Sequence, residues 1–189
     1  MSPGAAGRPP LMDIDLRPAA RALGTLVTAV DDERLADPTP CTAWSVGDLL
    51  DHLDVVAAGF TTLAGGAEKP GDGPWDAGRR AALADALAVM ADAWRDPAAW
   101  QGVAGPPELP RPTWGRIGLT ELVVHAWDLA RVLDRPAPDL PDDLLRVTLA
   151  HVEAFVPQAP LPELWGTPVA LGADAPLWDR VVAGTGRRP

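Results

Sequence analysis

A carboxylate and an imidazole stand four residues apart in a strongly helical stretch of the sequence. Glu121 and His125 lie within residues 118–133, where apolar residues recur at the spacing of one helical face. Each residue of an α-helix turns by roughly 100°, so Glu121 and His125 project from the same flank of this helix, with Asp128 one turn further on. Both groups can bind a transition metal, and both need a partner at an apolar margin. The spacing therefore predicts two ligands of a metal site.

A second helical stretch carries the third candidate ligand, His52. Residues 45–60 place His52 at the edge of an apolar stripe, as His125 is placed in its own helix. If the two helices pack on their stripes, His52 approaches Glu121 and His125. Two imidazoles and one carboxylate leave a coordination position for water or substrate, as in catalytic rather than structural metal sites. This donor set suits Zn²⁺, and it also suits Fe²⁺ or Ni²⁺.

Each of these residues also has a purely structural interpretation. A glutamate and a histidine four residues apart are common on helices that bind no metal. Asp128 would either hydrogen-bond the second nitrogen of a ligand or lie on the helix surface. The lone Cys41 would be packed in a turn or act as a reactive thiol. His151 would be a satisfied histidine at the core margin, a fourth ligand or a proton shuttle.

Helices are the elements that must position these residues. Apolar periodicity and capping signals predict helices over residues 15–31, 45–65, 76–94, 118–133 and 142–155, and a short one over 176–183. Ser45 and Asp48 resemble a capping box at the start of the helix that bears His52. This pattern predicts an all-α protein, a four-helix bundle with extra short helices and an irregular C-terminal segment, in which residues 164–171 are extended.

The connections between these helices are rich in proline and glycine. Residues 66–76 form either a mobile lid or a slack connection, and residues 97–114 make a loop long enough to border a site. Trp75, Trp100 and Trp114 fall in these loops, where they are candidates to wall a pocket for a hydrophobic substrate.

Length and charge limit the classes of function. The chain has 189 residues, of which 1–12 are predicted to be a disordered N-terminal segment and 13–189 a single domain. Its net charge of -10, with no basic stripe, argues against nucleic acid and anionic membrane as partners. One cysteine, and no signal peptide or membrane-spanning stretch, predict a cytoplasmic protein.

Three blocks of the sequence, in order, resemble a known family. They are TPCTAWSVGDLLDH at residues 39–52, ELVVHAWD at residues 121–128, and DAPLWDR at residues 174–180 with TGRRP at 185–189. The chain resembles the stand-alone actinobacterial metal-binding proteins related to the N-terminal domain of mycothiol-dependent maleylpyruvate isomerase, within the DinB-like superfamily. The similarity runs from about Asp13 to the C-terminus.

The resemblance implies a four-helix bundle with a divalent metal, usually zinc, held by His52, Glu121 and His125. It also implies chemistry in which the metal activates a low-molecular-weight thiol such as mycothiol, because a cation stabilises the reactive thiolate. The isomerase itself has an additional C-terminal domain that completes its active site, and these 189 residues contain no such domain. The expectation is therefore the broader activity class rather than maleylpyruvate isomerisation.

We accordingly expect a metal-dependent thiol transferase or isomerase that acts on a small electrophilic substrate. A second hypothesis is a thiol-independent lyase, cyclase or hydrolase of specialised metabolism on the same fold. A third is a non-catalytic protein that binds a small molecule and confers resistance to it. The expected partners are a small-molecule substrate and a low-molecular-weight thiol, and the protein is expected to be a monomer or a homodimer.

Overall fold

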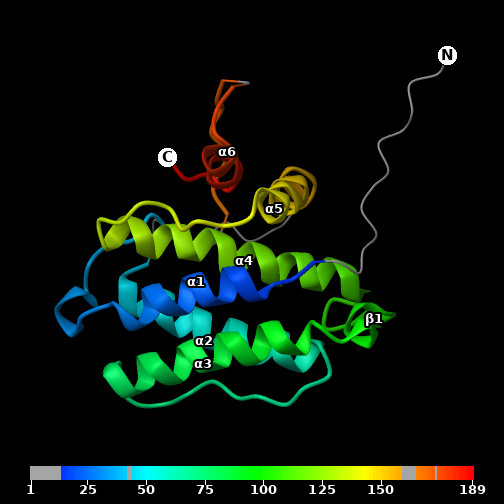
Figure 1. The fold of residues 1–189 in the computed structure, drawn as a ribbon, viewed down its shortest axis with the longest axis horizontal. Coiled ribbons are helices and arrows are strands. Elements are labelled where there is room, and N and C mark those ends of the chain that lie inside the picture. Colours follow the sequence, from blue (N-terminus) through cyan, green and yellow to red (C-terminus); the bar gives the residue numbers. More distant parts are fainter. Residues whose placement is uncertain (1–13, 42–43, 159–164, 173) are drawn as a thin grey trace.

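The computed structural model describes residues 14–41, 44–158, 165–172 and 174–189. Within these ranges the chain folds into six α-helices, as Figure 1 shows. The prediction of a disordered segment over residues 1–12 lies outside the described residues. The helices are α1 (Arg17–Thr28), α2 (Val46–Leu63), α3 (Ala77–Ala93), α4 (Arg111–Val132), α5 (Asp142–Phe155) and α6 (Leu177–Gly184).

The first four helices form a bundle, and the last two cover one side of it. Helices α1 and α2 each pack against both α3 and α4. Helix α5 lies on the outer side of α4 and holds α6 in turn, so both C-terminal helices stand on the α4 side of the bundle (Figure 1). Helix α4 is therefore covered on both sides. The predicted all-α bundle with short additional helices is confirmed.

The core is made by the apolar stripes that the sequence displays. Leu23 of α1, Leu53 of α2, Leu87 of α3 and Leu122 of α4 are each completely or almost completely buried. Burying side chains of this size contributes about 1.5–3 kcal/mol each, so these stripes dominate the packing of the bundle. Because α4 has neighbours on two sides, every residue from Gly118 to Ala130 is buried, including four polar ones.

Helix α2 begins where the sequence predicts. Ser45 accepts a hydrogen bond from the amide of Asp48, whose carboxylate accepts one from the amide of Ser45, which confirms the capping box. This reciprocal cap starts the helix two turns before His52. The register of His52 on α2 is thus determined locally.

Helix α4 is longer than the sequence predicts. It begins at Arg111 rather than at residue 118, so the end of the predicted loop 97–114 is helical. Pro112 fits the first turn because its missing amide hydrogen would have no helical acceptor there. Gly115 weakens the helical signal but lets α4 approach Trp94 and Trp100 closely, since a Cβ atom there would overlap both rings. Tertiary packing therefore overrides a weak local propensity.

The remainder of the predicted loop contains a small hairpin. Strands β1 (Val103–Ala104) and β2 (Leu109–Pro110) pair antiparallel just before α4. Hydrogen bonds hold the other predicted loop, residues 66–76, against the bundle. The amide of Gly71 donates to the buried carboxylate of Asp54, and Arg79 donates to the carbonyl of Gly73. The predicted extended segment 164–171 is described from Trp165 onward, where it forms no strand but makes main-chain hydrogen bonds to Ala183 and Thr185.

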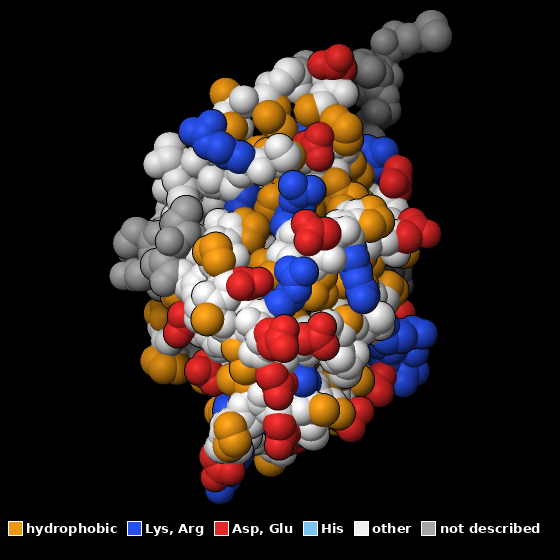
Figure 2. Space-filling view, turned by 90° about the vertical axis from the view of Figure 1, so that its left-hand side faces the viewer, with side chains coloured by type: hydrophobic (Ala, Val, Ile, Leu, Met, Phe, Trp, Pro, Cys, Tyr) orange, Lys and Arg blue, Asp and Glu red, His pale blue; other side chains and the backbone are white. Residues whose placement is uncertain are grey.

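The surface carries both signs of charge. Figure 2 shows acidic and basic side chains scattered among apolar ones on one face, with acidic groups gathering toward its lower end. That face offers no continuous basic surface of the kind that nucleic acid requires. None of the helices in the described ranges is both long enough and apolar enough to cross a membrane.

Candidate metal centre

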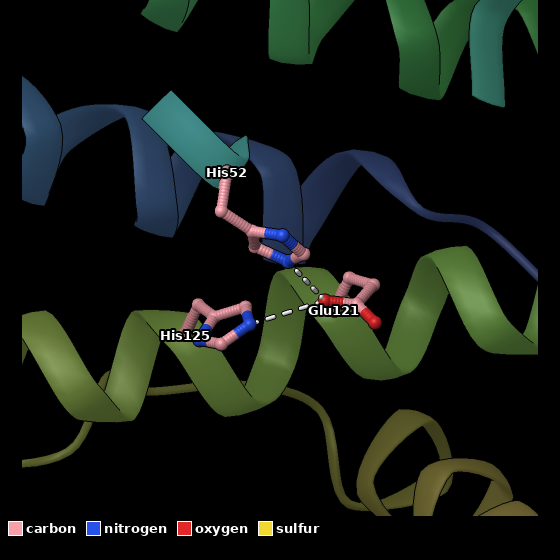
Figure 3. A group of neighbouring side chains, drawn as sticks. All are labelled: His52, Glu121 and His125. Atoms are coloured by element: carbon pink, nitrogen blue, oxygen red, sulfur yellow. Dashed lines mark hydrogen bonds and ion pairs between the residues drawn. The ribbon is translucent and has the colours of Figure 1, made fainter. Parts of the chain in front are cut away.

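Three side chains from two helices meet inside the bundle. His52 comes from α2, and Glu121 and His125 come from α4, one turn apart (Figure 3). Glu121 Oε2 lies 3.0 Å from His52 Nε2 and 3.1 Å from His125 Nε2. One ligand atom from each residue lies within 4.8 Å of the other two, so the three could together hold a metal ion.

Burial makes this cluster unusual for polar groups. Glu121 is 3% exposed and His125 is completely buried, whereas the side chain of His52 keeps 20% of its surface exposed. A buried carboxylate or imidazole is stable only when it is paired or bound to a metal. Of the three residues, His52 is therefore the one whose side chain has appreciable contact with solvent.

The charges in the cluster compensate one another. Burial by itself would raise the pKa of Glu121, but the adjacent imidazoles of His125 and His52 outweigh this effect and lower the pKa to about 2. Burial likewise disfavours the charged form of His125, yet the carboxylates of Asp128 and Glu121 raise its pKa above the ordinary value. Glu121 is therefore a carboxylate at neutral pH, and a divalent cation could replace the protons between it and the imidazoles.

One buried nitrogen of the cluster lacks a hydrogen bond. His125 Nε2 is fully covered, and although Glu121 Oε2 is close enough for ion pairing, no hydrogen bond of ordinary geometry reaches this nitrogen. Buried polar atoms without a partner are rare, and a binding site for an ion is one recognised reason for them. The residues present therefore fit a divalent metal, with the free nitrogen of His125 facing the other two donors.

The other nitrogen of His125 is held by Asp128. His125 Nδ1 lies 2.9 Å from Asp128 Oδ2, and the carboxylate is completely buried. Of the two predicted alternatives, the structure places Asp128 on Nδ1 of His125, a candidate ligand, rather than on the helix surface. Burial would raise the pKa of Asp128, but Arg187 and His125 outweigh it and hold the pKa below the usual value.

Cys41 and Trp44 border the cluster from the segment that precedes α2. Burial raises the pKa of the Cys41 thiol to about 11, with nearby Arg187 opposing and Asp128 adding to this shift. Such a thiol is protonated at neutral pH, so Cys41 is a poor nucleophile. The ring of Trp44 lies 4.7 Å from that of His52 and 6.3 Å from that of His125, between centroids.

The tryptophans predicted to wall a pocket are engaged elsewhere. Trp75 donates to Asp51, Trp100 packs edge-on against Trp94, and Trp114 packs against Phe60. Their hydrogen bonds and ring contacts serve to pack the loops onto the bundle. The aromatic ring beside the cluster is instead that of Trp44, which sequence reasoning did not single out.

His151, the third histidine, lies outside the cluster. It is on α5, 8% exposed, with its ring stacked 4.9 Å from that of Phe155. Burial and the positive charge of Arg116 lower its pKa to about 4. The described metal-competent group does not include His151. The structure therefore favours its interpretation as a core-edge histidine over a fourth ligand.

The low pKa of His151 predicts acid sensitivity. The unfolded chain takes up a proton at this residue near pH 6.5, whereas the folded chain does so only near pH 4, so stability is lost as the pH falls between these values. The full shift corresponds to about 3 kcal/mol. We expect His151→Leu to reduce the loss of unfolding free energy between pH 7 and pH 4, measured by urea unfolding in the presence of a chelator. An unchanged pH dependence in His151→Leu would contradict this assignment.

Sequence reasoning missed Arg187 as a functional residue. Its guanidinium is buried and donates two hydrogen bonds to Asp128, at 2.9 Å and 2.8 Å. Arg187 and Trp44 both lie in the blocks that carry the family resemblance, at residues 185–189 and 39–52. Their position in these blocks is the feature of the sequence that could have identified them. No local spacing, however, relates either residue to His125.

Comparisons with known proteins agree with the fold. The family model described as mycothiol maleylpyruvate isomerase N-terminal domain matches residues 16–130. Two similar relatives are uncharacterized proteins of Mycobacterium tuberculosis, Rv0738 of strain H37Rv and MT0763 of strain CDC 1551. Each is 30% identical over 141 residues, covering 73% of this chain and 75% of the relative. No solved structure was found to match the chain.

Proposed function

The chain belongs to the mycothiol maleylpyruvate isomerase N-terminal domain family, with its DinB-like bundle, and from this premise we propose that it is a metal-dependent enzyme. The metal would be a divalent ion held by His52, Glu121 and His125, and Zn²⁺ suits this donor set best, with Ni²⁺ and Fe²⁺ as alternatives. The observation that carries the proposal is the buried Nε2 of His125, which faces two further donors and has no hydrogen bond.

The proposed reaction uses a low-molecular-weight thiol of the mycothiol type and a small electrophilic substrate. A divalent ion in this position supplies stabilisation of a thiolate at neutral pH, where a free thiol is mostly protonated. Cys41 does not provide the nucleophile, because burial raises the pKa of its thiol to about 11. The reactive sulfur is therefore expected to come from a cosubstrate. Its thiolate would form a C–S bond with an electrophilic carbon of the substrate, whose neighbouring carbon then takes up a proton. In an isomerisation the thiolate would add to the double bond and be eliminated again, so that the thiol is released unchanged.

The chain's own residues prepare the site for such a reaction. Glu121 contributes one negative charge, while Asp128 and Arg187 form a pair that is neutral as a whole. Two neutral imidazoles and one carboxylate leave one positive charge on a bound divalent ion, which favours an anionic thiolate over a neutral thiol. The side chain of His52 keeps 20% of its surface exposed, so a small molecule would approach the cluster from this residue.

Turnover assays with defined components test the proposal. The protein is stripped with a chelator, reconstituted with Zn²⁺, Ni²⁺ or Fe²⁺, and incubated with a panel of electrophiles, with and without mycothiol. We expect product only when both metal and thiol are present, and none with His52→Ala. Turnover without thiol would favour a lyase, cyclase or hydrolase. Saturable binding of a panel member without any product would favour a binding or resistance protein.

A further inference from the structure

Arg187 reaches the candidate metal centre from the far end of the chain. It lies beyond α6 and outside residues 16–130, which the family model matches. Its side chain is only 3% exposed in spite of its charge. Nε donates to Asp128 Oδ1 at 2.9 Å and Nη2 donates to Asp128 Oδ2 at 2.8 Å, so the guanidinium binds both carboxylate oxygens. This two-point geometry fixes the plane of the carboxylate.

The same carboxylate holds His125. Asp128 Oδ2 accepts from Arg187 and also lies 2.9 Å from His125 Nδ1. A carboxylate on Nδ1 orients the imidazole ring and keeps the proton on that nitrogen, which leaves Nε2 as the donor atom for a metal. Arg187, Asp128 and His125 therefore form a continuous chain of contacts that ends at the cluster of possible ligands.

The C-terminal turn is built to bring Arg187 inward. Gly186 has a φ of 86°, and a Cβ atom there would lie 2.5 Å from Cα of Gly166, so this close crossing requires glycine. The amide of Arg187 donates to the carbonyl of Val182 at 3.1 Å, and its guanidinium lies 5.7 Å from the ring of Trp165. Backbone and side-chain contacts together hold the guanidinium at Asp128.

We propose that Arg187 is a positioning residue for the metal centre, acting through Asp128 on the ring of His125. The inference rests on the metal site of the proposed function and adds that the C-terminal segment sets its affinity. Residues that orient a metal-bound histidine through a carboxylate typically change metal affinity by about 10–100-fold when they are replaced. Without Arg187 the buried carboxylate loses its two-point partner, so it holds the His125 ring in a less defined orientation.

The test compares two neighbouring arginines. Arg187→Gln and Arg188→Gln remove the same charge, but Arg188 is exposed. Zn²⁺ affinity is measured by competition with a chromophoric chelator, and ligand geometry by the visible absorption of the Co²⁺-substituted protein. We expect about 10–100-fold weaker Zn²⁺ binding and an altered Co²⁺ spectrum for Arg187→Gln, with both unchanged for Arg188→Gln. Wild-type affinity and spectrum in folded Arg187→Gln would overturn the inference.

A double variant shows whether Arg187 acts through Asp128, and it keeps the test valid if Arg187→Gln fails to fold. Asp128→Asn combined with Arg187→Gln leaves no buried unpaired charge, so it is expected to fold. We expect its Zn²⁺ affinity to equal that of Asp128→Asn alone, because the arginine has nothing further to act on. A further tenfold loss would overturn the inference. Failure of the wild-type protein to bind any metal would instead overturn the proposed function.

Discussion

Replacing His125 with alanine is expected to abolish stoichiometric metal binding. Three ligands hold the proposed ion, and zinc sites with four ligands bind with about 10–16 kcal/mol, which is roughly 3 kcal/mol per ligand. Loss of one ligand should therefore weaken binding at least about a hundredfold. The measurement is elemental analysis of the purified protein, as wild type, His52→Ala and His125→Ala, after zinc has been supplied and excess removed.

The third histidine provides the matched control for this experiment. His151→Ala removes the same side chain from a place outside the cluster, so it is expected to retain the wild-type metal content. Metal that persists in both His52→Ala and His125→Ala would show that the ion binds elsewhere. A wild-type protein that remains free of metal would remove the basis for a metal-dependent reaction.

A methyl group added at Gly115 is expected to destabilise the protein. Its Cβ atom would lie 2.4 Å from Cζ3 of Trp100 and 2.9 Å from Cζ3 of Trp94, both far below contact distance. Neither ring can withdraw easily, because Trp94 is 1% and Trp100 7% exposed and each donates its indole hydrogen to a main-chain carbonyl. Overpacking of this kind costs about 1–3 kcal/mol. We expect Gly115→Ala to lower the free energy of unfolding by that amount.

Gly59→Ala is the opposite case and serves as the control. Gly59 lies in the C-terminal half of α2, inside the helix, and is exposed. A Cβ atom added there would have no heavy atom within 4 Å. Alanine there improves helix propensity by about 1 kcal/mol and meets no obstacle. Thermal unfolding should separate the two variants, since about 1 kcal/mol corresponds to about 2–4 °C in a chain of this size. Equal melting temperatures would contradict the close approach of α4 to the two tryptophans.

The effects expected at His125 and at Gly115 both depend on the position of α4. Helix α4 carries two of the three possible ligands, and its position is determined by packing at both ends. Gly115 lets the N-terminal part of α4 lie against Trp94 and Trp100. Near the other end of α4, Asp128 forms an ion pair with Arg187. The geometry of Glu121 and His125, which lie between these contacts, thus depends on residues far away in the sequence.

Much of the site could be predicted because its signals are local. The helical phase of Glu121 and His125 follows from a spacing of four residues, and the capping box of Ser45 and Asp48 fixes where α2 begins and hence the register of His52. Local hydrogen bonding and apolar periodicity operate over a few residues, so they can be read directly along the chain. They were sufficient to predict an all-α bundle and the three residues that the structure brings together.

Only the tertiary structure decided what lies around those residues. Arg187 contacts Asp128 across 59 residues of sequence, and no periodicity encodes this separation. Helix α4 begins early although the local sequence predicts a loop there. Its first turns pack against the rings of Trp94 and Trp100, and only the missing side chain of Gly115 leaves room for these rings. Such contacts arise when helices pack in one register among many, because burial and charge pairing are satisfied together only in that arrangement. The sequence by itself determined the candidate ligands, and the packing determined which buried groups hold them in place.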